Sequence, residues 1–355
     1  MNILDCSPNF GTLSAGFESF QENEVVEVLN LEKDAHYGYN SIHKQWFPKS
    51  YESLSQYEPE NNIDLAIFNP EYGGKVSGNS KNNFFFYDFQ DCLNFLERLN
   101  PEFAIFKTEI DVIPLLNNAI DYVRDGFGQL SKDRLIYELK NMGYKPHLIV
   151  IDEADYGIPL HRSFAFYVAT PNDFNLTFPK SRFTATGRGQ YSKYRSVADA
   201  IGDLEDMGEW VEYNGKPRNS YQRSLRNLDS GKVTWHIPSK IKDSTKQRIS
   251  SIKQGSNNDT SVLDGKIQGY KRAKWNTICT SMGEEFYTAS GRIGMTLHPL
   301  KNRPFSIREG CRIHGLPDRL SFELKTPKKS LGKMIHESVA PAIGEILALA
   351  LQKNS

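Results

Sequence analysis

Short apolar runs alternate with amphipathic stretches along the first half of the chain. Each run has the length of a buried strand and is closed by turn-forming Gly, Pro, Asn or Asp residues. Between the runs, apolar positions three and four residues apart indicate helices with one buried face. We expect strands over 2–6, 24–29, 64–68, 103–106, 147–151 and 164–169, and helices over 13–18, 83–99, 131–142 and 331–352. Strands that alternate with helices predict an open α/β sheet.

The stretch from Asp64 to Gly74 is the centre of this pattern. It begins as a buried apolar strand and ends in a turn rich in Asn, Pro and Gly. The chemistry of an open α/β sheet is usually carried by the loops that follow its central strands. We therefore expect the loop with Glu71 and Tyr72 to face any active site.

The composition indicates the class of protein. The 355 residues are 39% hydrophobic and 24% charged, which is ordinary for a globular protein with one large and one smaller domain. No apolar run reaches the roughly 18 residues of a membrane helix, and the N-terminus lacks a secretory signal. The four cysteines are scattered without metal-ligand spacing. We expect a cytoplasmic protein with reduced thiols and no metal site.

Charge is unevenly distributed although the net charge is zero. Residues 1–170 hold 13 Lys and Arg against 25 Asp and Glu, residues 171–292 hold 20 against 13, and residues 293–355 hold 10 against 5. A bound polyanion would therefore meet the second half of the chain. A solvated basic loop region is the alternative, which charge alone does not exclude.

Several motifs together resemble the DNA cytosine-5 methyltransferase family nearly from end to end. They are the helix start Leu13–Glu18, the turn Asp155–Pro159, the segment Arg303–Asp318 and the stretch Val339–Pro341. The resemblance implies a Rossmann-type sheet of the S-adenosylmethionine-dependent methyltransferase kind, with a smaller and irregular target-recognition domain. It places the catalytic-fold domain at 1–170 and 325–355 and the DNA-binding domain at 171–324.

The resemblance also shows which catalytic positions have changed. The family's attacking Cys corresponds to Tyr72, beside Glu71, and the Glu that protonates cytosine corresponds to Lys107. An Arg beside the target base corresponds to Phe164, while the neighbouring Arg162 is kept. Tyr has a pKa near 10 and is a poor substitute for a thiolate. We expect no catalytic residues in the family's sense.

The positions that bind S-adenosylmethionine in the family have changed as well. The first loop has Ser7 where the family has an aromatic residue and Asn9 where it has Gly, although Gly11 is kept. Asn tolerates the positive φ of the replaced Gly. The ribose-binding strand end and the last cofactor position are now Asn30, Leu31 and Glu337, with Glu32 as a substitute if the register slips. We therefore expect no bound cofactor, with S-adenosylmethionine as the alternative.

The second half supplies candidates for DNA binding. Phrases around residues 196–204 and 220–226 resemble a phage and bacterial branch of the family. Arg suits phosphate and guanine, and Gln suits adenine, so the candidates are Arg218, Gln222, Arg223 and Arg226. Salt bridges within the domain are the alternative for Arg223 and Arg226.

Three functions fit these observations. The first is a methyltransferase-fold pseudoenzyme that binds double-stranded DNA and partners an active methyltransferase or a restriction system. The second is an active S-adenosylmethionine-dependent enzyme that modifies a DNA base in an atypical site. The third is a regulatory module that binds another protein.

Overall fold

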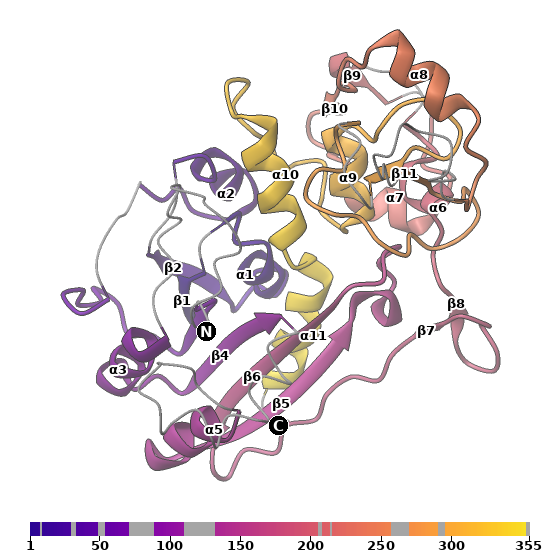
Figure 1. The fold of residues 1–355 in the computed structure, drawn as a ribbon. Coiled ribbons are helices and arrows are strands. Elements are labelled where there is room, and N and C mark those ends of the chain that lie inside the picture. Colours follow the sequence, from indigo (N-terminus) through magenta and orange to yellow (C-terminus); the bar gives the residue numbers. More distant parts are fainter. Residues whose placement is uncertain are drawn as a thin grey trace, which may run out of the picture. The chain divides into compact units, whose positions relative to one another are not determined.

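The fold is that of a computed structural model, which describes residues 1–7, 9–29, 33–48, 54–70, 89–109, 132–204, 208–213, 215–256, 270–289 and 295–352. The chain forms two compact units (Figure 1). Unit 1 comprises Met1–Asp152, Ser163–Pro179 and Ile343–Ser355, and unit 2 comprises Glu153–Arg162 and Lys180–Ala342.

Unit 1 is built on a six-stranded sheet with the order β2-β1-β3-β4-β6-β5. The strands β1, β2, β3 and β4 pair in parallel, whereas β6 runs antiparallel to both β4 and β5. The strands are β1 (Asn2–Cys6), β2 (Glu24–Val28), β3 (Leu65–Phe68), β4 (Phe103–Glu109), β5 (Tyr144–Asp152) and β6 (Ser163–Pro171). This sheet confirms the predicted α/β class.

Helices cover the sheet because its strands are apolar on both faces. All four residues of β3 are buried. One face packs against α3 and α5 in a core that includes Phe68, Phe95, Phe106 and Leu139. The helices of unit 1 are α1 (Thr12–Phe17), α2 (His36–Ile42), α3 (Phe89–Leu99), α5 (Lys132–Asn141) and α11 (Pro341–Leu351).

The helix α11 lies directly against α1. A Cβ at Gly344 would overlap the carbonyl oxygen of Leu13, so only glycine allows the two backbones to approach this closely. The Ser19 hydroxyl donates to the Glu345 carboxylate at 3.0 Å on the same seam. The C-terminal helix α11 therefore packs within the same compact unit as the N-terminal strand β1.

Unit 2 has many short elements and small two-stranded sheets. The pairs are β9 with β10 (antiparallel), β11 with β12 (parallel) and β7 with β8 (parallel). Its elements are the 3-10 helix η2 (Glu153–Tyr156), β7 (Phe183–Thr184), β8 (Ser192–Lys193), α6 (Val197–Ile201), β9 (Gly208–Glu212), α7 (Ser220–Leu225), β10 (Lys232–His236), α8 (Asp243–Ser250), β11 (Tyr270–Arg272), β12 (Met295–Leu297), α9 (Ile307–Ile313) and α10 (Lys328–Glu337).

Buried ion pairs hold the middle of unit 2 together. Arg312 donates two hydrogen bonds to Asp318, at 2.7 and 2.6 Å, and lies 3.2 Å from Asp203. Arg308 is fully buried and donates to the carbonyls of Thr234 and Leu320. The segment around Arg308 therefore stabilises unit 2 by hydrogen bonds and ion pairs in the interior of that unit.

The single long helix expected over 331–352 is wrong. The chain forms α10 and α11 instead, with Ser338–Ala340 between them. Pro341 begins α11, and the residue before a proline disfavours helical geometry. By length and composition Lys328–Leu351 could cross a membrane, but 61% of its apolar window is buried inside the protein, as in a core helix.

The two compact units differ from the predicted domains at their edges. The sequence places the boundaries at 170/171 and 324/325. Residues 153–162 and 325–342 belong to unit 2, and 171–179 to unit 1. The assignment of separate catalytic-fold and DNA-binding roles to the two parts stays a prediction.

Candidate functional site

The loop after β1 is held by a buried carboxylate. Asp5, at the end of β1, accepts hydrogen bonds from the Ser7 backbone N–H (2.9 Å), the Ser14 hydroxyl and the Tyr39 hydroxyl (2.9 Å). Ser7 also donates its own hydroxyl to Asp5. Burial and the neighbouring Asp5 carboxylate raise the pKa of Tyr39 well above its usual value. Tyr39 therefore stays a neutral donor, and Ser7 is fixed by internal bonds.

Asn9 and Gly11 give this loop its path. Their φ angles are 109° and 63°, both in the region that glycine adopts without strain. The Asn9 side chain accepts from the Phe10 N–H at 2.7 Å, which ties the turn locally. A Cβ at Gly11 would overlap the ring of Tyr39. Ser7, Asn9 and Gly11 thus lie in one tight turn, as predicted from the sequence.

The space beside Gly11 is filled by the rings of Tyr39 and His43, which no motif in the sequence indicated. Tyr39 and His43 stack with their centroids 3.9 Å apart, and His43 Nδ1 lies 2.9 Å from Glu18. The two rings lie four residues apart at the end of α2, a spacing that places them on one helix face. That spacing is the signal that could have found them.

Lys107 and Phe164 meet on one face of the sheet. Lys107 on β4 pairs with Phe166 on β6, so Phe164 is its diagonal neighbour two residues along. The Lys107 ammonium lies 4.7 Å from the centroid of the Phe164 ring. Both residues are buried, with exposures of 6% and 1%. The two changed positions therefore form a cation–π pair with each other.

Arg162 is occupied in joining three segments of unit 2. Its guanidinium binds Glu153 at 2.8 Å and also donates to the carbonyls of His336 and Ser338. Glu153 is fully buried and accepts in addition from the Ala340 N–H at 2.9 Å. The retained Arg162 therefore ties the turn after η2 to the end of α10.

The remaining predicted cofactor and catalytic positions are less informative. Glu337 lies on α10, half-buried, with a carboxylate oxygen 3.7 Å from the ammonium of Lys333 one helical turn earlier. Glu71, Tyr72, Asn30 and Leu31 lie outside the described residues.

The four candidate DNA-binding residues separate into two pairs. Gln222 is fully buried, and its amide accepts from the Arg218 N–H at 2.7 Å and donates to the Ala198 carbonyl at 3.3 Å. Arg226 is 9% exposed and lies 2.7 Å from the Asp203 carboxylate. This geometry favours the internal salt bridge for Arg226 and does not suit Gln222 to base readout.

Arg218 and Arg223 are exposed. Arg223 lies on α7, whose N-terminus is capped by the Asn219 side chain. These two guanidinium groups are the members of the predicted set that solvent and a ligand can reach.

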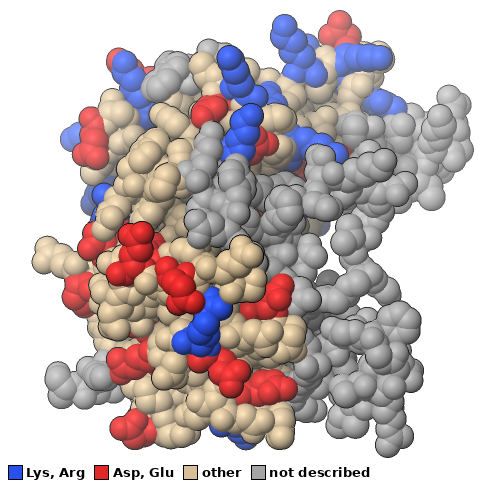
Figure 2. Space-filling view, turned by 90° about the vertical axis from the view of Figure 1, so that its left-hand side faces the viewer, with Lys and Arg blue, Asp and Glu red and all other residues tan. Residues whose placement is uncertain are grey.

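The two units carry opposite charge. Unit 1 has 13 Lys and Arg against 25 Asp and Glu, a net of −12, and unit 2 has 30 against 18, a net of +12. Groups of acidic side chains, and separate groups of basic side chains, are visible on the face drawn in Figure 2. A polyanion would be attracted to unit 2.

The chain matches known proteins along its length. Residues 129–353 match the family described as C-5 cytosine-specific DNA methylase. The chain is 26% identical to the type II methyltransferase M.DdeI of Desulfomicrobium norvegicum, over all of this chain and 88% of that protein. It is 19% identical to the type II methyltransferase M1.HphI of Haemophilus parahaemolyticus, over 99% of this chain and 87% of that one.

Two solved structures share the fold. One is an E. coli prophage-encoded protein assigned as a DNA modification methyltransferase, with a TM-score of 0.71 at 17% identity, covering 99% of this chain and 98% of that one. The other is the S. pombe Dnmt2 methyltransferase, with a TM-score of 0.59 at 13% identity, covering 99% and 98%.

Proposed function

Because the chain belongs to the C-5 cytosine-specific DNA methylase family, we propose that it binds duplex DNA, and that it does so through unit 2. We propose in addition that it does not transfer a methyl group. It would act as a specificity partner or regulator of an active methyltransferase or restriction system. Its four cysteines are free, buried thiols, which fits a reducing cytoplasm.

The Lys107–Phe164 pair is the observation that carries this proposal. By the resemblance, these two positions would hold the acid that protonates cytosine and an Arg beside the base. A carboxylate stabilises the cationic, protonated base, whereas an ammonium repels it. The Lys107 ammonium lies instead over the ring of Phe164, so both positions pack against each other.

The sequence at the nucleophile position supports the same reading. The position has Tyr72, whose phenol is far less ionised at neutral pH than a thiol. One compensating residue would not replace both the attacking group and the acid.

DNA binding is supported by the charge and exposure of unit 2. Its net charge is +12, and Arg218 and Arg223 are exposed. Lys and Arg that neutralise phosphates release counterions, so binding should be strongest at low salt.

The test is a mobility-shift assay of the purified chain with duplex DNA at low and moderate salt, beside an assay of labelled methyl transfer to the same DNA. We expect a shift that weakens as salt rises, and no transfer. An absence of binding at low salt would refute the DNA-binding proposal, and transfer above background would refute the loss of catalysis.

An active enzyme with an atypical site is the second candidate. It is favoured by Asn9 and Gly11, which keep positive φ angles so that the loop after β1 retains the path of a glycine-rich turn. Calorimetry with S-adenosylmethionine separates the two proposals. Heat of binding at micromolar ligand would favour the enzyme, and none at millimolar ligand would favour the pseudoenzyme.

A further inference from the structure

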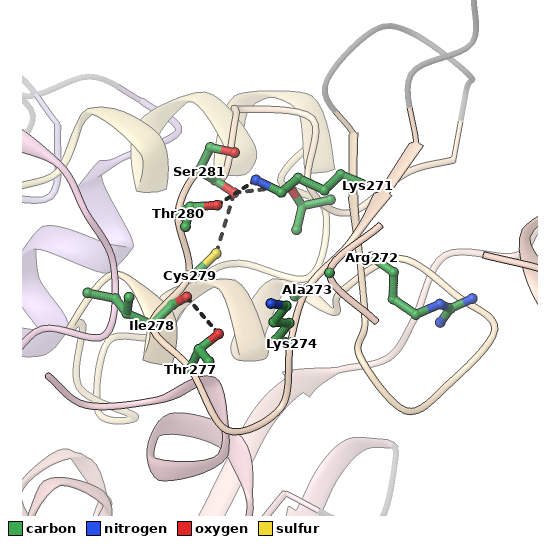
Figure 3. Close-up of a pocket in the computed structure, with 11 residues that line it drawn as sticks. Lys271, Arg272, Ala273, Lys274, Thr277, Ile278, Cys279, Thr280 and Ser281 are labelled. Atoms are coloured by element: carbon green, nitrogen blue, oxygen red, sulfur yellow. Dashed lines mark hydrogen bonds between the residues drawn. The ribbon is translucent and has the colours of Figure 1, made fainter. Parts of the chain in front are cut away.

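Unit 2 contains a cavity of about 330 Å³ beside β11 (Figure 3). Its wall is formed by Gly255, β11, the loop that follows β11 and one residue of β12. This volume lies at the lower end of the range for small-molecule sites, which suits a ligand of nucleotide size. Of the residues predicted from the sequence to bind DNA or cofactor, none of those that the structure describes lines it.

The lining of the cavity is basic and rich in hydroxyl groups. Of the 11 lining residues, three are Lys or Arg, four are Ser or Thr, and none is Asp or Glu. Burial raises the pKa of Cys279 to about 11, so this thiol also adds no negative charge. Among the described residues, the lining therefore offers donors and positive charge without a competing carboxylate.

The alternation of β11 directs Lys271 into the cavity. Tyr270 and Arg272 point the other way and are buried, with exposures of 1% and 4%. The Lys271 ammonium donates to the Thr280 hydroxyl at 2.5 Å across the cavity wall (Figure 3). Lys271 forms no ion pair with an acidic side chain in the described part of the chain.

Arg272 contributes its backbone to the wall and not its charge. Its guanidinium donates to the carbonyls of Ile252, His298, Lys301 and Ile249 and to the Asn302 side chain. Figure 3 shows the guanidinium directed away from the other drawn side chains. Among the described lining residues, Lys271 and Lys274 remain as cations for a ligand.

Lys274 crosses the cavity rim over a glycine. Gly255 has a φ of 76°, and a Cβ there would overlap the methylene groups of Lys274. Gly255 also donates its N–H to the Arg272 carbonyl at 2.8 Å, which holds it beside β11. The glycine therefore provides the room in which the Lys274 side chain lies.

Hydrogen bonds hold the far wall in place. The Cys279 N–H donates to the Pro159 carbonyl, and the Cys279 carbonyl accepts from the His161 N–H, both at 3.0 Å. Thr296 on β12 donates its hydroxyl to the Ser281 carbonyl at 3.0 Å. The donors therefore stand on a formed wall, which lowers the cost of ordering them around a ligand.

We propose that this cavity binds the phosphate group of a nucleotide-sized ligand, with Lys271 and Lys274 as its cationic partners and Thr280 as a hydroxyl donor. Ammonium and hydroxyl groups are the donors that phosphate oxygens accept from. The phosphate can belong to a free nucleotide or to a nucleotide of a DNA strand. The free-nucleotide case does not depend on the DNA binding proposed above.

The test is calorimetry of the full chain with deoxyadenosine monophosphate, deoxyadenosine and inorganic phosphate. We expect the nucleotide to bind at least about tenfold more tightly than the nucleoside. The double variant Lys271→Gln/Lys274→Gln should weaken nucleotide binding at least about tenfold. The matched control is Lys246→Gln, at an exposed lysine on α8 of the same unit, and should change binding less than twofold.

Two results would overturn the proposal: no binding of any of the three probes, or equal nucleotide binding by the wild type and a double variant whose circular dichroism is unchanged. If the double variant does not fold, Thr280→Val replaces it, with an expected loss of several-fold. Competition with duplex DNA then identifies the source of the phosphate. Displacement of the nucleotide assigns the cavity to DNA, and undisturbed nucleotide binding assigns it to a free nucleotide.

Discussion

Arg226 and Arg223 lie three residues apart at the end of α7, and their surroundings predict opposite consequences of the same substitution. Arg226→Met removes a guanidinium whose Nε lies 2.8 Å and whose Nη2 lies 2.7 Å from one oxygen of Asp203. Breaking a buried ion pair on one side costs about 3–5 kcal/mol. Arg312 remains 3.2 Å from the other Asp203 oxygen, so we expect the lower end of that range, about 3 kcal/mol.

Arg223→Met is the matched control. Arg223 is exposed, and exposed substitutions usually change the free energy of unfolding by less than about 0.5 kcal/mol. If Arg223 contacts a phosphate, its loss should lower the dependence of log affinity on log salt by about 0.9. Arg226→Met should leave that salt dependence unchanged wherever the variant is folded.

The measurements are urea unfolding followed by circular dichroism and DNA affinity at several salt concentrations. The reasoning fails if Arg226→Met unfolds like the wild type while losing DNA affinity. That result would mean that the Arg226 side chain leaves Asp203 to reach DNA, which is one of the two roles that the sequence left open.

Three further predictions concern buried residues, one in unit 2 and two in unit 1. Burial alone would raise the pKa of Glu309, but its bonds to Arg303 lower this pKa to about 2. Glu309→Gln should therefore lower the free energy of unfolding by about 3 kcal/mol at pH 7. Urea unfolding should show that the difference between the two proteins vanishes as pH falls from about 4.5 toward 2. Gly11→Ala, at a φ of 63° and against the Tyr39 ring, should cost about 2 kcal/mol by thermal unfolding; an unchanged melting temperature would contradict the described turn. Lys107→Glu places a carboxylate against an aromatic face and should destabilise by about 2 kcal/mol without restoring methyl transfer; measurable transfer would refute the loss of the site.

The sheet was predictable from the sequence because its signal is local. The apolar run before Asn69 forms β3, with all four residues buried. Strand ends were less predictable, since pairing with a neighbour extends a strand past its apolar residues. The strand expected over 147–151 runs from Tyr144 to Asp152 because β6 pairs with it along that whole length.

Side-chain roles in unit 2 were harder to predict. Gln222 and Arg226 have the chemistry of DNA readout, and only tertiary burial shows that the protein itself uses their polar groups. The break between α10 and α11 is a different case, since Pro341 marks it in the sequence. The cavity beside β11 could not be predicted, because its residues are ordinary until the chain brings 255, 271–274, 277–281 and 296 together.

The opposite charges of the two units have a kinetic consequence. The chain has no net charge, yet unit 1 carries −12 and unit 2 carries +12. Near a long polyanion unit 1 is repelled and unit 2 is attracted, so encounters that begin at unit 2 are favoured over those that begin at unit 1. Added salt removes this preference as the Debye length shortens to about 8 Å at physiological ionic strength. A protein of zero net charge can in this way meet a polyanion faster than its net charge alone suggests.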